Sequence, residues 1–214
     1  MTRRVRPSVC LLAAVIALTA GCATSTSAAR ETPTSVPTSA SVTAPAGPAV
    51  RSAPGATLAF GQSAVLPATA FAAQGPTAMY TVTGITPAEG VPDDTTRGGD
   101  PYFVYVTVTS LAARPAPAPG VIGLAGSPDG HTAALTLSPT PGLAKCPTTA
   151  PPARMSRGES YSTCLVSVAD EGSRLRQVIY WADTAGLPQF DFEAAPVVWS
   201  QPGQPPTSVT PSAG

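Results

Sequence analysis

His131 is the only histidine in this chain of 214 residues, and it is the first candidate for acid–base chemistry. It follows Asp129-Gly130, so an imidazole and a carboxylate could act as a base with an acid beside it. That chemistry needs a nucleophile, and the chain has no Gly-x-Ser-x-Gly elbow or other nucleophile motif. We therefore predict a histidine in a hairpin turn at the start of a strand, and no catalytic residue.

Three carboxylates, Asp93, Asp94 and Asp100, form an acidic stretch that could offer oxygen ligands to calcium. Their spacing does not match a known calcium loop, so a solvated turn is the better interpretation. A zinc site would need several nitrogen or sulfur ligands at close spacing, and the chain has one histidine. The sequence predicts neither a metal nor a cofactor.

The N-terminal residues have the pattern of an export signal. Three arginines (Arg3, Arg4 and Arg6) precede an apolar run over residues 9–18, and small residues follow up to Cys22. The apolar run is too short to remain in a bilayer, because a membrane-spanning helix needs about 20 apolar residues. We therefore expect residues 1–21 to be a signal peptide.

The segment Leu18-Thr19-Ala20-Gly21-Cys22 resembles the lipobox of bacterial lipoproteins. The resemblance implies cleavage before Cys22 and attachment of lipid to its thiol and its new amino end. The sequence departs from the family at Thr19, where leucine is usual, and Leu18 stands one residue earlier. The alternatives are ordinary secretion with cleavage nearby and an uncleaved anchor. We expect a lipid anchor in the cell membrane, with the protein on its extracytoplasmic side.

Two cysteines remain once Cys10 leaves with the signal and Cys22 carries lipid. Cys146 and Cys164 then form an even pair outside the reducing cytosol, and we predict that they are joined by a disulfide. Cys164 is in phase with Val166 and Val168 and should face a core. A metal site or a redox pair fits the spacing of these two cysteines poorly.

Charge excludes one class of partner. The chain has twelve basic and twelve acidic residues, and the loss of the three signal arginines leaves the mature protein mildly acidic. A nucleic-acid-binding surface needs a concentration of basic residues, so we expect no nucleic-acid partner.

Composition divides the mature chain into three parts. Residues 22–56 consist almost entirely of Ser, Thr, Ala, Pro, Val and Gly, which predicts a disordered tether, and the composition also resembles O-glycosylated stalks. Residues 201–214 repeat this composition and should form a disordered tail. Residues 57–200 are long enough for one domain with its own core.

The domain has the period of two that is typical of β-strands. In the strand expected over residues 101–109, Val104, Val106 and Val108 share one face. Similar alternation marks residues 79–85, where Gly84 predicts a bulge or a close approach, and residues 131–137 and 175–181. Trp181 and Trp199 could floor a sugar site, but their phase predicts core packing. The pattern predicts an all-β, antiparallel β-sandwich of immunoglobulin type.

The order of these strands also resembles a known family. It runs through Val82-Thr83-Gly84-Ile85, residues 102–110, an Asp129-Gly130 turn, Arg157-Gly158-Glu159 before residues 164–168, and residues 178–181. This order is similar to the immunoglobulin-like domain of exported proteins of Gram-positive bacteria, a family of unknown function. The sequence departs from it after the central strand, where Ser110-Leu111-Ala112 and a Pro-rich insert stand. The resemblance implies a fold and an exported context, and no catalytic residue.

Phe103 and Tyr105 provide the one hint of a binding surface, because they alternate with the inward-facing valines. We therefore expect a non-catalytic binding or protein-interaction module whose partner is an envelope protein or polymer. The alternative is an accessory or sensor subunit of an envelope transporter or enzyme complex.

Overall fold

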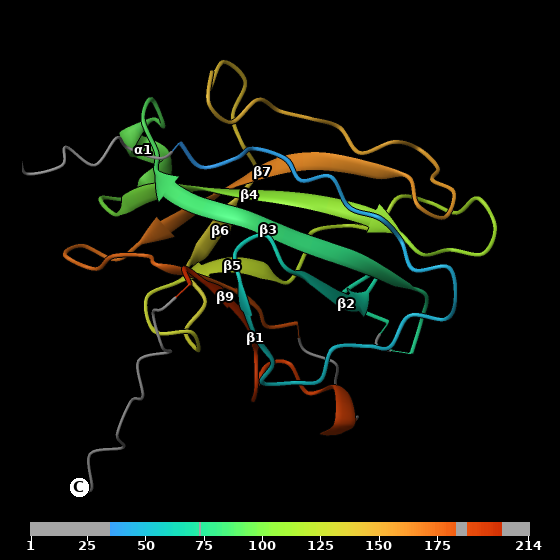
Figure 1. The fold of residues 1–214 in the computed structure, drawn as a ribbon. Helices are drawn as coiled ribbons and strands as arrows, with labels where there is room; N and C mark the ends of the chain where they lie inside the picture. Colours follow the sequence, from blue (N-terminus) through green and yellow to red (C-terminus); the bar gives the residue numbers. More distant parts are fainter. Residues whose placement is uncertain (1–34, 73, 183–187, 203–214) are drawn as a thin grey trace, which may run out of the picture. The chain divides into compact units, whose positions relative to one another are not determined.

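The protein folds as a β-sandwich of immunoglobulin-like type, as the sequence predicts, and its two sheets are antiparallel apart from one parallel pair of strands at an edge (Figure 1). The computed structural model describes residues 35–72, 74–182 and 188–202. One sheet has the strand order β1-β9-β8-β5, with β1 at Thr57–Ala59, β9 at Val197–Ser200, β8 at Gln177–Tyr180 and β5 at Leu124–Ser127. The other has the order β2-β3-β4-β7-β6, with β2 at Ser63–Pro67, β3 at Thr77–Pro87, β4 at Asp100–Ser110, β7 at Ser160–Ala169 and β6 at Leu135–Leu137. The short helices α1 (Asp93–Thr96) and η1 (Pro188–Phe190) lie in connections.

The main core lies between the two sheets. Val104, Val106 and Val108 of β4 are fully buried in it, which confirms the predicted inner face of this strand. Tyr80 of β3 and Tyr180 of β8 meet across the core with ring centroids 6.3 Å apart. Burial raises the pKa of Tyr180 to about 12, so this phenol stays neutral at physiological pH.

A second core covers the outer face of the five-stranded sheet. Phe103 and Tyr105 point to this face and pack against Leu143, Cys146 and Cys164. Phe103 is 0% exposed and Tyr105 is 5% exposed, so the predicted exposed aromatic face is wrong. The sequence pattern shows that these side chains oppose the valines, but it does not show that other segments of the chain cover them.

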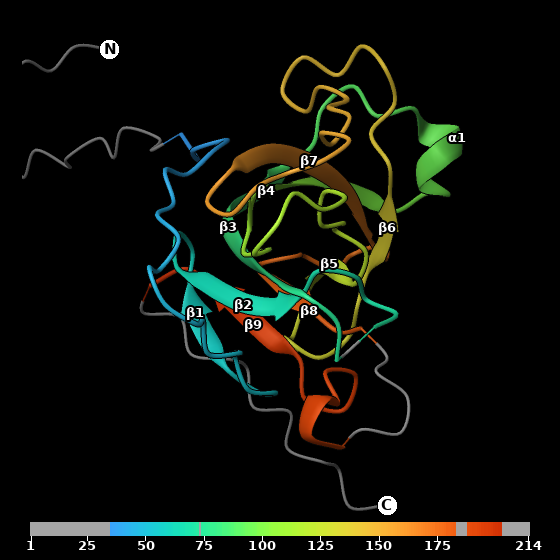
Figure 2. The ribbon, with the colours of Figure 1, turned by 90° about the vertical axis from the view of Figure 1, so that its right-hand side faces the viewer.

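One of the covering segments is residues 35–50, which we call the strap. It crosses the outer face of the five-stranded sheet, where it appears as the blue segment in Figures 1 and 2. The hydroxyl of Thr83 donates a hydrogen bond to the carbonyl of Pro37, and the amide of Ala40 donates to Thr107 Oγ1 at 2.9 Å. The domain boundary therefore lies earlier than the predicted residue 57. Residues 51–56 of the predicted tether also contact the domain, where the amide of Ser52 donates to the carbonyl of Val65 at 2.9 Å. Residues 22–34 of the predicted tether lie outside the described residues, as does the tail from residue 203.

The loop between β6 and β7 provides the other cover. It passes over β7 in Figure 2 and is fixed by the disulfide between Cys146 and Cys164, whose Cα atoms are 5.4 Å apart. This confirms the predicted disulfide. Because Cys164 lies in the middle of β7 and faces outward, the bond holds the loop directly above Tyr105, its cross-strand neighbour.

Two smaller predictions about side-chain direction are wrong. Trp181 follows the last residue of β8 and is 39% exposed, because the face of β8 that packs in the main core carries Val178 and Tyr180, one residue out of phase with the prediction. Ile179, on the same face as Trp181, packs in a separate cluster with Ala125 and Val198. Leu135, which the alternation of residues 131–137 predicts to face inward, is 47% exposed, because β6 is a three-residue edge strand that pairs with β7 on one side. Trp199, by contrast, is fully buried as predicted.

Candidate functional site: a cavity beneath the strap

The first part of the strap is held at a notch in β3. The register between β3 and β4 shifts between Val82 and Gly84, which is the bulge that the sequence predicts. A Cβ atom on Gly84 would overlap the side chain of Val36, so the strap comes closer here than any larger residue would allow. The bulge also turns Thr83 toward the strap, where its hydroxyl reaches Pro37. Gly84 therefore marks both the bulge and a close approach.

The other end of the strap is held by one arginine. Arg157 lies in the turn before β7, and its guanidinium donates to the carbonyls of Pro45 at 2.8 Å and Gly47 at 2.5 Å. A third hydrogen bond, to the carbonyl of Leu111, is 2.8 Å long. Because the guanidinium is planar and has five donors, it can connect the strap to the end of β4 in one fixed orientation.

Hydroxyl pairs lie on the outer sheet face beside the strap. Thr107 and Ser162 are cross-strand neighbours with their side-chain oxygens 2.9 Å apart, and Thr109 and Ser160 form the next pair at 2.7 Å. Such pairs satisfy polar groups that would otherwise be costly to bury. This face is therefore polar toward one end of β4 and aromatic toward the other.

A cavity of about 570 Å³ lies where the strap, the disulfide loop and the sheet meet. The described residues that line it are Ser35, Val36, Thr38, Ser39, Thr86, Pro87, Tyr105, Ala144, Lys145, Pro147, Thr149, Ser162, Thr163 and Cys164. Thr38, Ala144 and Lys145 are exposed, so the cavity opens to solvent. The disulfide and the seated strap shape its walls.

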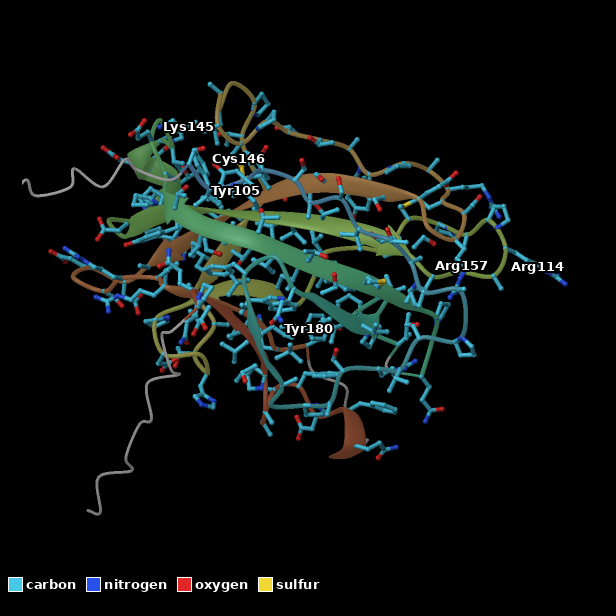
Figure 3. The ribbon with its side chains drawn as sticks, in the orientation of Figure 1. Tyr105, Arg114, Lys145, Cys146, Arg157 and Tyr180 are labelled. Carbon is cyan, nitrogen blue, oxygen red and sulfur yellow. A yellow bond between two sulfur atoms is a disulfide. The ribbon has the colours of Figure 1, made fainter. Side chains whose placement is uncertain are left out.

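The lining is apolar and hydroxylic, with one charged side chain. Lys145 lies at the rim, and its ammonium is 2.8 Å from a carboxylate oxygen of Glu89. Figure 3 shows Lys145, Cys146 and Tyr105 close together at this end of the sheet. The hydrogen bond from Lys145 lowers the pKa of Glu89, and the same bond raises the pKa of Lys145. Both groups therefore remain charged at neutral pH, although an exposed pair of this kind adds little stability.

A second hollow among the described residues has a different character. It is about 320 Å³ and lies beside the end of α1, with Arg97, Asp170 and Glu171 among its lining residues. These three charged residues are all exposed to solvent. A shallow site between solvated charges offers less apolar contact to a ligand than the cavity beneath the strap.

The predicted acid–base candidates play a structural part. Asp129 Oδ1 accepts hydrogen bonds from the amides of His131 at 2.8 Å and Thr132 at 2.7 Å, and from the hydroxyl of Ser127 at 3.1 Å. Burial alone would raise the pKa of Asp129, but these bonds and the Thr132 hydroxyl lower it to about 2. The carboxylate therefore closes a turn, and His131 lies exposed in it. The turn is not the predicted hairpin, because it connects β5 and β6, which belong to different sheets, and β6 begins only at Leu135.

The acidic residues do not meet. Asp93 and Asp94 lie in α1, whereas Asp100 begins β4. Among residues 35–72, 74–182 and 188–202, no three potential ligands of the His, Cys, Asp and Glu types come together around one point where a metal ion could sit. In the same residues, no helix has the length and the apolar character needed to cross a membrane. Cys22, the predicted lipidation site, lies outside them.

Sequence reasoning missed the site itself. The sequence predicts that the strap belongs to the disordered tether, because its composition is that of a disordered chain. The one signal that could have found it was Gly84, since a glycine in a strand indicates a close approach as well as a bulge.

Comparison with known proteins gives a distant structural likeness. No family model matches the sequence, and no curated protein matches it. Among solved structures, a secreted protein of Mycobacterium tuberculosis, MPT63, aligns with a TM-score of 0.46 and 12% sequence identity. The alignment covers 67% of this chain and 95% of that one. A likeness this distant assigns no function to the chain.

Proposed function

We propose that the protein is an extracytoplasmic, lipid-anchored binding module without catalytic activity, and that the cavity beneath the strap is its binding site. The cavity is the observation that carries this proposal. Its volume of about 570 Å³ falls within the range of small-molecule sites, roughly 300 to 1,000 Å³. Its walls are held by the disulfide and by the strap, which is attached to β3 near Val36 at one end and to Arg157 at the other.

The lining indicates the class of ligand. Val36, Tyr105 and Pro87 offer apolar surface, while several threonines and serines offer single hydrogen bonds. The one charged group, Lys145, already has a carboxylate partner in Glu89. The ligand that fits is a mostly apolar molecule with few hydrogen-bonding groups, and an acidic group on it could replace Glu89 at the rim.

A fluorescent probe with an apolar body and one anionic group, 1-anilinonaphthalene-8-sulfonate, tests this site. We expect saturable one-to-one binding to the full chain. Ala144→Trp would fill the cavity mouth from an exposed position and should weaken binding at least tenfold. Ala153→Trp is the matched control, because Ala153 is exposed in the same disulfide-closed loop but does not line the cavity. Equal affinity of all three proteins would contradict the proposal.

The proposed location is supported by the disulfide, because such bonds persist outside the reducing cytosol. The signal-like N-terminus and Cys22 support the proposed anchor. Each buried methylene of a lipid chain contributes about 0.8 kcal/mol, so two or more chains hold a protein on the membrane. We expect the native protein to enter the detergent phase on phase separation and Cys22→Ala to enter the aqueous phase. Partition of both proteins into the aqueous phase would contradict the anchor.

A further inference from the structure

The segment that carries Val36 is repeated near the other end of the chain. Residues 33–40 read Pro-Thr-Ser-Val-Pro-Thr-Ser-Ala, and residues 206–213 read Pro-Thr-Ser-Val-Thr-Pro-Ser-Ala. Six of the eight positions are identical, and the remaining two exchange proline and threonine. Val209 aligns with Val36, and Ala213 aligns with Ala40. The chain therefore contains a second copy of the sequence around Val36, of which the structure describes residues 35–40 on the outer sheet face.

The second copy has what the docking site uses. The notch at Gly84 takes a valine side chain, and the next residue is held through its backbone carbonyl by Thr83. Three residues further on, a backbone amide donates to Thr107. Val209, the carbonyl of Thr210 and the amide of Ala213 supply these three groups in the same order. The two copies differ at two positions. Thr210 replaces Pro37, which is bonded only through its backbone carbonyl, and Pro211 replaces Thr38, which is exposed. Neither difference removes a described hydrogen bond.

The second copy is also within reach of the site. The carbonyl of Ser200, at the end of β9, accepts a hydrogen bond of 2.9 Å from the amide of Phe60. The next residue, Gly61, donates to the carbonyl of Val82 at 2.8 Å, two residues before Gly84. The nine residues from Ser200 to Val209 can span about 30 Å when extended, which is more than this short path requires.

We propose that residues 206–213 of the same chain dock on the outer face of the five-stranded sheet in place of residues 33–40. The two segments exchange at one site, with Val209 in the Gly84 notch when Val36 is out. Docking of the tail releases the first part of the strap, so one wall of the cavity becomes tail and the N-terminal linker becomes longer. The exchange does not require the cavity to bind any ligand, so it stands independently of the proposed function.

Photo-crosslinking of the full chain tests the exchange. Ser208 is replaced by the photo-crosslinker p-benzoylphenylalanine, because Ser208 aligns with the exposed Ser35. The crosslinked peptides are mapped by mass spectrometry. The experiment uses an equal mixture of ¹⁵N-labelled and unlabelled protein, so that crosslinks within one chain are distinguished from crosslinks between two chains. We expect crosslinks to Pro87 or Lys145, which line the cavity beside Ser35. Val36→Asp should raise their yield at least threefold, whereas Val50→Asp should leave it unchanged because Val50 is 88% exposed.

A free peptide gives a second measurement that needs no change in the strap. An excess of the peptide 206–213 should suppress the crosslink, and the same peptide with Asp at the Val209 position should not. The proposal is overturned if Val36→Asp folds and shows no gain in crosslinks at the cavity, if labelled and unlabelled chains crosslink to each other there, or if both peptides act alike.

Discussion

Val36 occupies the space that a Cβ atom on Gly84 would fill, so the strap and the β3 bulge fit together through one valine and one glycine. This contact places the strap across a face that already contains a buried aromatic cluster and paired hydroxyls. It explains why a segment with the composition of a linker is held against the domain.

Gly84→Ala should displace the start of the strap. The new methyl group meets the end of the Val36 side chain, and the strap is the partner that can move. We expect a loss of about 1 kcal/mol in the free energy of unfolding, the value of partly burying one valine, and faster amide hydrogen exchange over residues 36–44. Gly120→Ala is the control, because a Cβ atom there meets nothing within 4 Å. Unchanged exchange in Gly84→Ala would show that the contact does not hold the strap.

Arg157→Ala should release the other end. The variant loses two hydrogen bonds to the strap and one to Leu111, and we expect a cost of about 1 to 3 kcal/mol. Limited proteolysis should cut first within residues 44–50. Arg114→Ala provides the comparison, since Arg114 is exposed and points away from the domain in Figure 3. If the two variants are cleaved at the same rate, Arg157 does not clamp the strap.

Removal of the disulfide should destabilise the domain and open the cavity. The bond joins residues separated by 18 positions, which corresponds to about 3 kcal/mol in the chain-entropy model. Denaturant unfolding with and without reductant measures this difference in the free energy of unfolding. A Cys146→Ala/Cys164→Ala variant should have the same free energy of unfolding as the reduced protein, and reductant should not change it. An equally stable reduced native protein would show that the loop is held by its packing alone.

Asp129 should make stability depend on pH in an acidic window. Its pKa is about 2 in the folded protein and about 3.9 in an unfolded chain, so the carboxylate stabilises the fold fully above pH 4. That contribution is lost as the pH falls toward 2. We expect Asp129→Asn to cost about 1 kcal/mol at pH 7, after allowance for solvent screening, and the difference from the native protein to shrink between pH 4 and pH 2. Asp94→Asn, at an exposed position of α1, is the control. A difference that stays constant over this range would exclude the carboxylate as its cause.

The sequence predicted the parts of the fold that local patterns determine. The alternation of Val104, Val106 and Val108 predicts the inner face of β4, and the even pair of cysteines predicts the disulfide. Cys164 shares a face with Val166 and Val168 as predicted, but the core on that face is the second one, on the outer side of the sheet. The short strands β1, β2 and β5 were missed, because three to five residues carry too little alternation to stand out from their Ala- and Pro-rich surroundings.

The cavity could not be predicted in the same way. It depends on three segments far apart in the chain, namely the strap, Tyr105 and the loop around Lys145, and no local pattern indicates that they meet. The composition of the strap predicts a disordered segment and therefore no cavity wall, since a Ser-, Thr- and Pro-rich segment buries little apolar surface of its own. The strap is held because the sheet face supplies the apolar notch, a hydrogen-bond donor at Thr83 and an acceptor at Thr107.

Native mass spectrometry of the protein purified from its own membrane tests most directly whether the cavity is a binding site. The proposed function predicts one non-covalent, mostly apolar molecule per chain, present in the native protein and in Ala153→Trp and absent from Ala144→Trp. The same bound mass in all three proteins would place the molecule elsewhere, and no bound mass in the native protein, together with no probe binding, would contradict the account.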